Sequence, residues 1–184
     1  MSITLDAKKQ WLLDVRQVYS PNCDERPANC EVDLVVMHGI SLPPQEYGGA
    51  YIDQLFSNSL DPQAHPYFAE INELRVSSHL LVDRAGEITQ YVPFDRRAWH
   101  AGESEFQGRR TCNDFSIGIE LEGCDDQAYA PVQYAVAATL VKLLMENWQG
   151  INKQRVVGHC HISPGRKTDP GEAFNWDYFY SLLD

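Results

Sequence analysis

The sequence predicts an α/β fold, a single domain in which helices flank a mixed central β-sheet. Short apolar runs rich in β-branched residues, at 33–37 and 155–158, indicate strands buried on both faces. A helical pattern over residues 131–148 lies among the strand-like segments, and such alternation is typical of layered α/β domains. A length of 184 residues is enough for one well-packed domain and short for two. We therefore expect one domain over residues 1–184.

The first third of the chain alternates weak and strong signals. Residues 5–19 carry apolar side chains at mixed spacing and predict a short helix on the edge of the domain. Residues 20–31 are interrupted by proline and asparagine and predict a loop. The buried strand at 33–37 then ends at His38. Residues 39–68 lack periodicity but hold several aromatic side chains, so we expect an ordered wall beside a functional site.

The middle of the chain predicts β structure. Residues 79–92 contain two apolar runs around a turn with Gly86, which indicates a hairpin. Residues 116–123 alternate with the period of two that is typical of a strand. Ile117, Ile119 and Leu121 should face the core. The opposite face should then carry Ser116, Gly118, Glu120 and Glu122, with Gly118 leaving space beside Glu120.

The last third begins with the clearest helix, over residues 131–148, which starts with a proline suited to a first turn. Gly150 should end that helix, and a strand at 155–158 should follow it. Asn175 is suited to cap a final short helix that extends to Leu183.

Composition excludes several classes of function. A formal net charge of −11 argues against a nucleic-acid partner, because phosphate binding needs clustered lysine and arginine. Nothing approaches the roughly 18 consecutive apolar residues of a membrane span, so we expect no membrane partner. The N-terminal segment lacks the order of a secretion signal, and five cysteines at irregular spacing do not suggest a disulfide framework. We therefore predict a cytoplasmic protein.

Two histidines occupy positions that favour a metal site. His38 and His159 each follow an apolar strand, and side chains at the ends of neighbouring strands converge in open α/β sheets. A catalytic zinc uses three protein ligands and keeps one position open. His161 would lie on the same side of a strand as His159, Cys160 would point into the core, and Asp169 returns from a loop. The residues alone leave His161 and Asp169 as alternatives for the third ligand.

Two further side chains fit the chemistry of a hydrolytic metal site. Glu120 lies on the small-residue face of its strand, where burial of a carboxylate is costly without a purpose, and beside a metal it can act as general base. Lys167 precedes Asp169 in the same loop and can stabilise an oxyanion.

Several ordered stretches resemble the AmpD family, cytoplasmic zinc amidases of peptidoglycan recycling within the wider group of N-acetylmuramoyl-L-alanine amidases and peptidoglycan recognition proteins. The resemblance extends from about Trp11 to Phe179. The matching stretches are VMHGISLPP (36–44), DPQAHPYF (61–68), LRVSSH (74–79), YVPFD (91–95), RAWHAG (97–102), CNDFSIGIELEG (112–123), GHC (158–160) and RKTDPG (166–171).

The resemblance implies roles for individual residues. It implies that His38, His159 and Asp169 hold Zn²⁺, which decides between Asp169 and His161. It also implies that Glu120 is the general base and that Lys167 stabilises the transition state.

The resemblance implies a substrate site as well. Arg75 and Trp99 would help to hold the substrate, the arginine through its anionic groups. Two positions depart from the family pattern, where asparagine often follows the first zinc histidine and arginine usually precedes the cysteine of Cys-Asn-Asp-Phe. Here these positions are Gly39 and Thr111, and Arg110 could replace the missing arginine through a small shift of the loop.

The activity implied by the resemblance is hydrolysis of the amide bond between the lactyl group of 1,6-anhydro-N-acetylmuramic acid and L-alanine. The expected partner is therefore a small-molecule muropeptide, bound by a monomeric enzyme. The alternative is a non-catalytic recognition protein that binds muropeptide without cutting it. Such proteins lose a metal ligand, whereas this chain keeps His38, His159 and Asp169.

Overall fold

The computed structural model describes residues 3–184 as one α/β unit around a six-stranded sheet. The sheet contains, in spatial order, β12 (Val156–Gly158), β5 (Leu34–Ile40), β11 (Ser116–Glu122), β6 (Leu80–Val82), β7 (Ile88–Gln90) and β3 (Arg16–Gln17). The pairs β12–β5, β5–β11, β11–β6 and β3–β7 are parallel, whereas β6–β7 is antiparallel. The expectation of a mixed central sheet is therefore confirmed.

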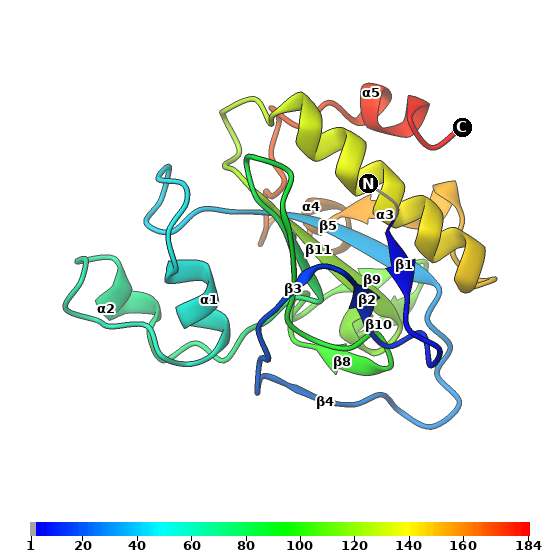
Figure 1. Cartoon of the computed structure of the whole chain (residues 1–184), viewed down its shortest axis with the longest axis horizontal. Helices are drawn as coiled ribbons and strands as arrows, with labels where there is room; N and C mark the ends of the chain where they lie inside the picture. Colours follow the sequence, from blue (N-terminus) through cyan, green and yellow to red (C-terminus); the bar gives the residue numbers. More distant parts are fainter. Residues whose placement is uncertain (1–2) are drawn as a thin grey trace.

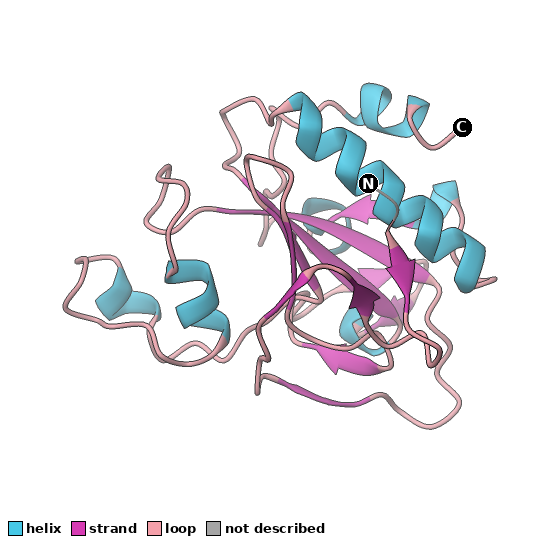
Figure 2. Ribbon diagram, in the orientation of Figure 1, coloured by secondary structure: helices cyan, strands magenta, loops and turns pink. Residues whose placement is uncertain are grey.

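The remaining elements surround this sheet (Figure 2). The helices are α1 (Tyr51–Phe56), α2 (Phe68–Ile71), α3 (Pro131–Asn147), α4 (His159–Ile162) and α5 (Trp176–Ser181), with 3₁₀ turns η1 (Cys112–Asp114) and η2 (Lys153–Arg155). The small antiparallel pairs are β1 (Thr4–Leu5) with β2 (Leu12–Leu13), β4 (Cys23–Glu25) with β8 (Arg96–Ala98), and β9 (Glu105–Phe106) with β10 (Arg109–Arg110).

The long helix α3 lies across one face of the sheet, with α5 beside it (Figure 1). Its buried side chains pack against Ile117, Ile119 and Leu121 of β11 in the largest apolar cluster. The same cluster includes Leu12 near the start of the chain and Leu183 near its end. One core therefore joins both ends of the chain.

The helices α1 and α2 form an arm that projects beyond the end of β5 (Figure 1). A second apolar cluster, which includes Leu42, Phe56, Phe68 and Tyr91, holds this arm against the rest of the domain. The expected ordered wall at residues 39–68 is thus confirmed, with two short helices at its centre and end.

The prediction of a helix over residues 5–19 is wrong. The segment forms β1, β2 and β3, and its turns place Lys9 and Asp14 at φ of 56° and 59°. The Asp6 carboxylate accepts hydrogen bonds from the backbone N–H groups of Gln10 and Trp11, which stabilises the turn between β1 and β2. The mixed apolar spacing belongs to three two-residue strands, in which only Leu12 is buried, and not to a helical stripe.

Most other local predictions are confirmed. The hairpin forms as β6 and β7, with Gly86 in its turn at φ +84°. The helix α3 has a proline in its first turn, and Asn175 caps α5 by accepting a hydrogen bond from Tyr178 N–H. The expected loop at 20–31 also contains β4, which pairs with β8.

Candidate metal centre and cavity

Strand register brings the predicted site residues together. His38 on β5 lies directly opposite Glu120 on the adjacent parallel strand β11. On the other side of β5, Gly158 of β12 pairs with Met37, so His159 follows at the level of His38. Residues far apart in sequence therefore meet at one edge of the sheet, as expected for the carboxyl ends of parallel strands.

Three side-chain atoms form a nearly equilateral triangle. His38 Nδ1, His159 Nδ1 and Asp169 Oδ2 are each 3.1 Å from the other two. Donors bound tetrahedrally to one ion at about 2.0–2.1 Å would lie roughly 3.3 Å apart, so the spacing fits a four-coordinate divalent metal. Two neutral imidazoles and one carboxylate also form a donor set that such ions accept. The three residues are therefore a candidate metal site.

The protonation states suit metal binding. Burial lowers the pKa of His38 to about 4, even though Asp169 acts in the opposite direction, so the imidazole is neutral. Burial alone would raise the pKa of Asp169, but hydrogen bonds with His159 and His38 outweigh burial and hold it well below its usual range. His38 therefore presents a lone pair, and Asp169 a negative charge, near neutral pH.

Glu120 faces the same cavity with little exposure to solvent. Its side chain is 7 % exposed, and burial, followed by the negative charge of Asp169, raises its pKa well above the usual range. Lys167 acts against this shift. A cation held by the triangle would also lower the pKa of Glu120, because a nearby positive charge favours the carboxylate. Glu120 is thus suited to accept and release a proton.

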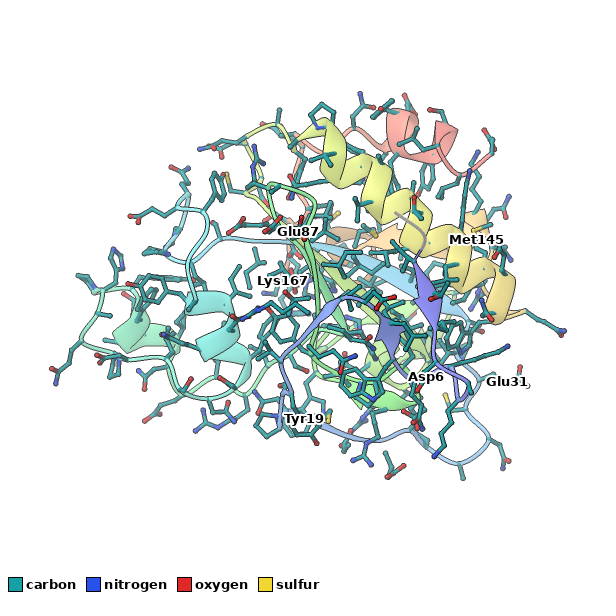
Figure 3. The ribbon with its side chains drawn as sticks, viewed as in Figure 1. Asp6, Tyr19, Glu31, Glu87, Met145 and Lys167 are labelled. Carbon is teal, nitrogen blue, oxygen red and sulfur yellow. The ribbon has the colours of Figure 1, made fainter. Side chains whose placement is uncertain are left out.

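A cavity of about 720 Å³ opens in front of these groups. One side is polar and includes the metal triangle, Glu120 and Lys167. The opposite side is formed by the α1–α2 arm and its neighbours, with Phe56, Tyr67, Ile71, Leu74 and Trp99. In Figure 3, Lys167 lies between this arm and the central strands. The cavity therefore combines an apolar wall with a reactive polar edge.

The other predicted substrate-binding residues occupy different places. Trp99 and Gly39 line the cavity. Arg75 is exposed and donates to the Asn72 carbonyl, while Arg110 lines a second cavity and pairs with Glu105. The structure therefore places Trp99 and Gly39 in the wall of this cavity, and Arg75 and Arg110 outside the set of residues that line it.

Gly39 has a structural role that its sequence position did not suggest. A Cβ atom at this position would overlap the hydroxyl oxygen of Tyr129. That hydroxyl instead donates to the Pro170 carbonyl, next to the predicted ligand Asp169. The glycine therefore admits the aromatic ring that supports the Asp169 loop.

The prediction that His161 lies on the same side as His159 is wrong. The strand β12 ends at Gly158, and both histidines belong to the helical turn α4. Residues two apart on a helix point in nearly opposite directions. His161 Nδ1 accepts from Gly158 N–H, and its ring packs near Trp176. Cys160, expected in the core, is half-buried, and its N–H donates to the Asp169 carbonyl.

Sequence reasoning missed a buried polar network behind the metal site. His100 Nδ1 is 2.9 Å from His38 Nε2, and the His100 ring lies on Gly118, where a Cβ would be 2.6 Å from its Cγ. Arg26 donates to the carbonyls of Asn113, Asp114, Phe94 and Ser116. The stretch RAWHAG (97–102) is one of the family matches in the sequence, but only the tertiary contacts show that His100 touches His38.

His79, whose Nε2 lies 3.1 Å from a guanidinium nitrogen of Arg26, should make stability depend on pH. Burial, followed by the charge of Arg26, lowers its pKa from 6.5 to about 3. Between these values the unfolded chain binds a proton that the folded protein does not. The contribution of His79 to the free energy of unfolding is therefore complete above about pH 6.5 and is lost as the pH decreases. The contribution is at most about 1.4 kcal/mol per pH unit.

This dependence can be measured by urea unfolding between about pH 7 and pH 5. His79→Asn retains an acceptor for the Gly118 N–H, which His79 Nδ1 accepts in the wild type, but cannot be protonated. We expect a shallower pH dependence in the variant. Equal slopes in the two proteins would contradict the assignment of a neutral, buried His79.

Comparison with known proteins gives the family. Residues 28–172 match the Amidase_2 family model, described as N-acetylmuramoyl-L-alanine amidase. The chain is 52% identical over 178 residues to 1,6-anhydro-N-acetylmuramyl-L-alanine amidase AmpD of Haemophilus influenzae, with 97% of each chain covered. The corresponding Escherichia coli protein is 56% identical over 173 residues, with 94% of each chain covered. The chain belongs to the AmpD family of N-acetylmuramoyl-L-alanine amidases.

Solved structures agree with this family assignment. The crystal structure of an Se-Met AmpD derivative matches with a TM-score of 0.94 and 53% identity, covering 98% of this chain and 99% of the other. A complex of Escherichia coli AmiD with the substrate anhydro-N-acetylmuramic acid-L-Ala-D-gamma-Glu-L-Lys matches with a TM-score of 0.60 and 27% identity. It covers 98% of this chain and 65% of AmiD. The AmpD-family fold therefore extends over nearly the whole chain.

None of the helices within residues 3–184 has the length and apolar character needed to span a lipid bilayer.

Proposed function

We propose that this protein hydrolyses the amide bond between the lactyl group of 1,6-anhydro-N-acetylmuramic acid and L-alanine in muropeptides, as part of peptidoglycan recycling. The observation that carries the proposal is the triangle of His38, His159 and Asp169 beside the buried Glu120, within a chain of the AmpD family. The donor set and its spacing support Zn²⁺ as the metal. Residues 1–184 would act as a single amidase domain.

Each side chain has a distinct role in this reaction. Bound zinc would supply a Lewis acid that makes water more acidic and polarises the carbonyl. Glu120 accepts the proton of the attacking water and delivers it to the departing alanine nitrogen. The ammonium group of Lys167 stabilises the negative charge that develops on the carbonyl oxygen of the lactyl group. The apolar wall with Trp99 orients the substrate, and Arg75 and Arg110 remain predicted contacts for its anionic groups.

The proposal is tested by mass spectrometry of the products formed from purified anhydro-muropeptide. We expect anhydro-N-acetylmuramic acid and the free peptide with the zinc-loaded protein, and intact substrate after treatment with a chelator. Release that continues at full rate in the chelated protein would contradict a metal-dependent amidase. Intact substrate that remains bound to the zinc-loaded protein would instead indicate a recognition protein.

The variant Lys167→Met should lower kcat by about 10²–10³-fold, because one donor to a developing oxyanion is lost. Zinc content should remain unchanged, since Lys167 is not among the three ligand residues. The matched control is Lys142→Met on α3, where the lysine donates to the C-terminal Asp184 far from the cavity. A wild-type kcat in Lys167→Met would contradict the role of this lysine.

We also propose a cytoplasmic, monomeric enzyme without nucleic-acid or membrane partners. All five cysteines are free, which is compatible with a reducing compartment. The net charge of −11 disfavours binding to nucleic acid. Size-exclusion chromatography with light scattering should give one species near the chain mass of 20.9 kDa.

A further inference from the structure

The segment His100–Ala101 contacts both histidines of the metal triangle on the side away from the ligand atoms. His100 Nδ1 lies 2.9 Å from His38 Nε2, and the Ala101 carbonyl lies 3.1 Å from His159 Nε2. The Asn113 side chain holds this segment, because its Oδ1 accepts from the N–H groups of both His100 and Ala101. One short stretch therefore provides hydrogen-bond partners for two metal ligands.

Because His38 and His159 contribute Nδ1 to the triangle, metal binding determines which ring nitrogen of each carries the hydrogen. His38 and His159 both present Nδ1 to Asp169, so each needs a lone pair on Nδ1 and a hydrogen on Nε2 to bind a metal. His159 Nε2–H then donates to the Ala101 carbonyl, which can only accept a hydrogen bond. For His38, the partner is an imidazole nitrogen, and only a deprotonated His100 Nδ1 can accept.

The surroundings of His100 support that single tautomer. With Nδ1 as acceptor, its proton lies on Nε2, which is 3.1 Å from the Ser116 hydroxyl and can donate to it. His100 is 9 % exposed, so few other hydrogen-bond partners can reach its ring. Gly118 leaves room for the ring against β11, two residues before Glu120. The opposite tautomer would place hydrogen on Nδ1 and force His38 to present N–H to the metal.

We infer that His100 is a positioning residue that fixes the tautomer and ring orientation of His38 through the chain His38 Nε2–H to His100 Nδ1 and His100 Nε2–H to Ser116 Oγ. Outer hydrogen bonds of this kind commonly change metal affinity by about 10–100-fold when removed. The inference rests on the proposed metal site, but it assigns a role to a residue outside the ligand triangle.

Two variants of nearly equal shape test whether His100 Nδ1 acts as the hydrogen-bond acceptor for His38. Asparagine at position 100 can place Oδ1 near the present Nδ1, whereas leucine has the same branched shape and no acceptor. We expect His100→Leu to weaken Zn²⁺ binding by about 10–100-fold in competition with a chromophoric chelator, and His100→Asn to recover most of that loss. The visible spectrum of the Co²⁺-substituted protein should change in His100→Leu and resemble the wild type in His100→Asn.

Each outcome decides the inference. Equal zinc affinity in wild type and His100→Leu would overturn the role of His100, and equal weakening in both variants would show that only the ring volume matters. A wild-type protein that binds no zinc would refute the metal site itself. If His100→Leu does not fold, Ser116→Ala decides the question. This change removes the acceptor of His100 Nε2–H, so zinc binding should weaken by about 10-fold, the low end of the usual effect of such a hydrogen bond. Unchanged affinity in Ser116→Ala would then overturn the inference.

Discussion

Glu120→Gln is expected to keep its zinc and to lose turnover by about 10²–10⁴-fold, the usual contribution of a positioned general acid–base group. Glutamine has the shape of glutamate but cannot accept a proton from water or return it to the alanine nitrogen. Glu120 lies outside the ligand triangle, so the metal should remain bound. Burial, followed by the charge of Asp169, raises the pKa of Glu120, and a cation bound close to it would lower that pKa again.

The measurement combines steady-state kinetics with zinc content for the purified variant. The matched control is Glu122→Gln, on the same face of β11. The Glu122 carboxylate accepts from the backbone N–H groups of Gly48 and Arg84, so this change should lower stability by about 1–3 kcal/mol and alter kcat only a few-fold. Full activity of Glu120→Gln would refute its role as the base.

Asp169→Asn is expected to lose zinc and, with it, activity. The carboxylate oxygen Oδ2 lies 3.1 Å from both histidine ligand atoms and provides the negative charge of the site. A neutral amide is a poorer ligand for a divalent cation, so zinc affinity should fall by more than the roughly 10–100-fold typical of an outer residue. Activity should return only in proportion to added zinc.

The control for this prediction is His161→Asn. His161 neighbours the ligand His159 in sequence, but its ring packs near Trp176 on the far side of α4. Zinc affinity should therefore remain that of the wild type. If His161→Asn lost its metal while Asp169→Asn kept it, the ligand set drawn from the structure would be incorrect.

Local sequence patterns predicted the elements that carry the site. Three patterns predicted their elements correctly: the apolar run before His38, the period-two alternation around Glu120 and the helical pattern of α3. In each, the spacing of apolar residues within the segment is enough to indicate a strand or a helix. The pattern at residues 5–19 failed because short strands of two residues carry too few side chains for a recognisable period.

The third ligand shows where such reasoning stops. Residues 159 and 161 share a side only if the strand continues, and the chain instead turns into α4 directly after Gly158. Asp169 reaches the site because Cys160 N–H binds its carbonyl and Tyr129 supports the Pro170 carbonyl that follows. These contacts join distant segments, so the spacing of residues along the sequence did not reveal them.

By itself, the sequence determined the α/β class, the strands that present His38 and Glu120, and the family to which the chain belongs. Residue patterns left the third ligand open and the family resemblance implied Asp169, but only the tertiary structure brings Asp169 to His38 and places His100 behind it. The physical reason is that hydrophobic periodicity depends on which side chains one element buries. A metal site depends instead on the register of neighbouring strands and on the loops that pack between them.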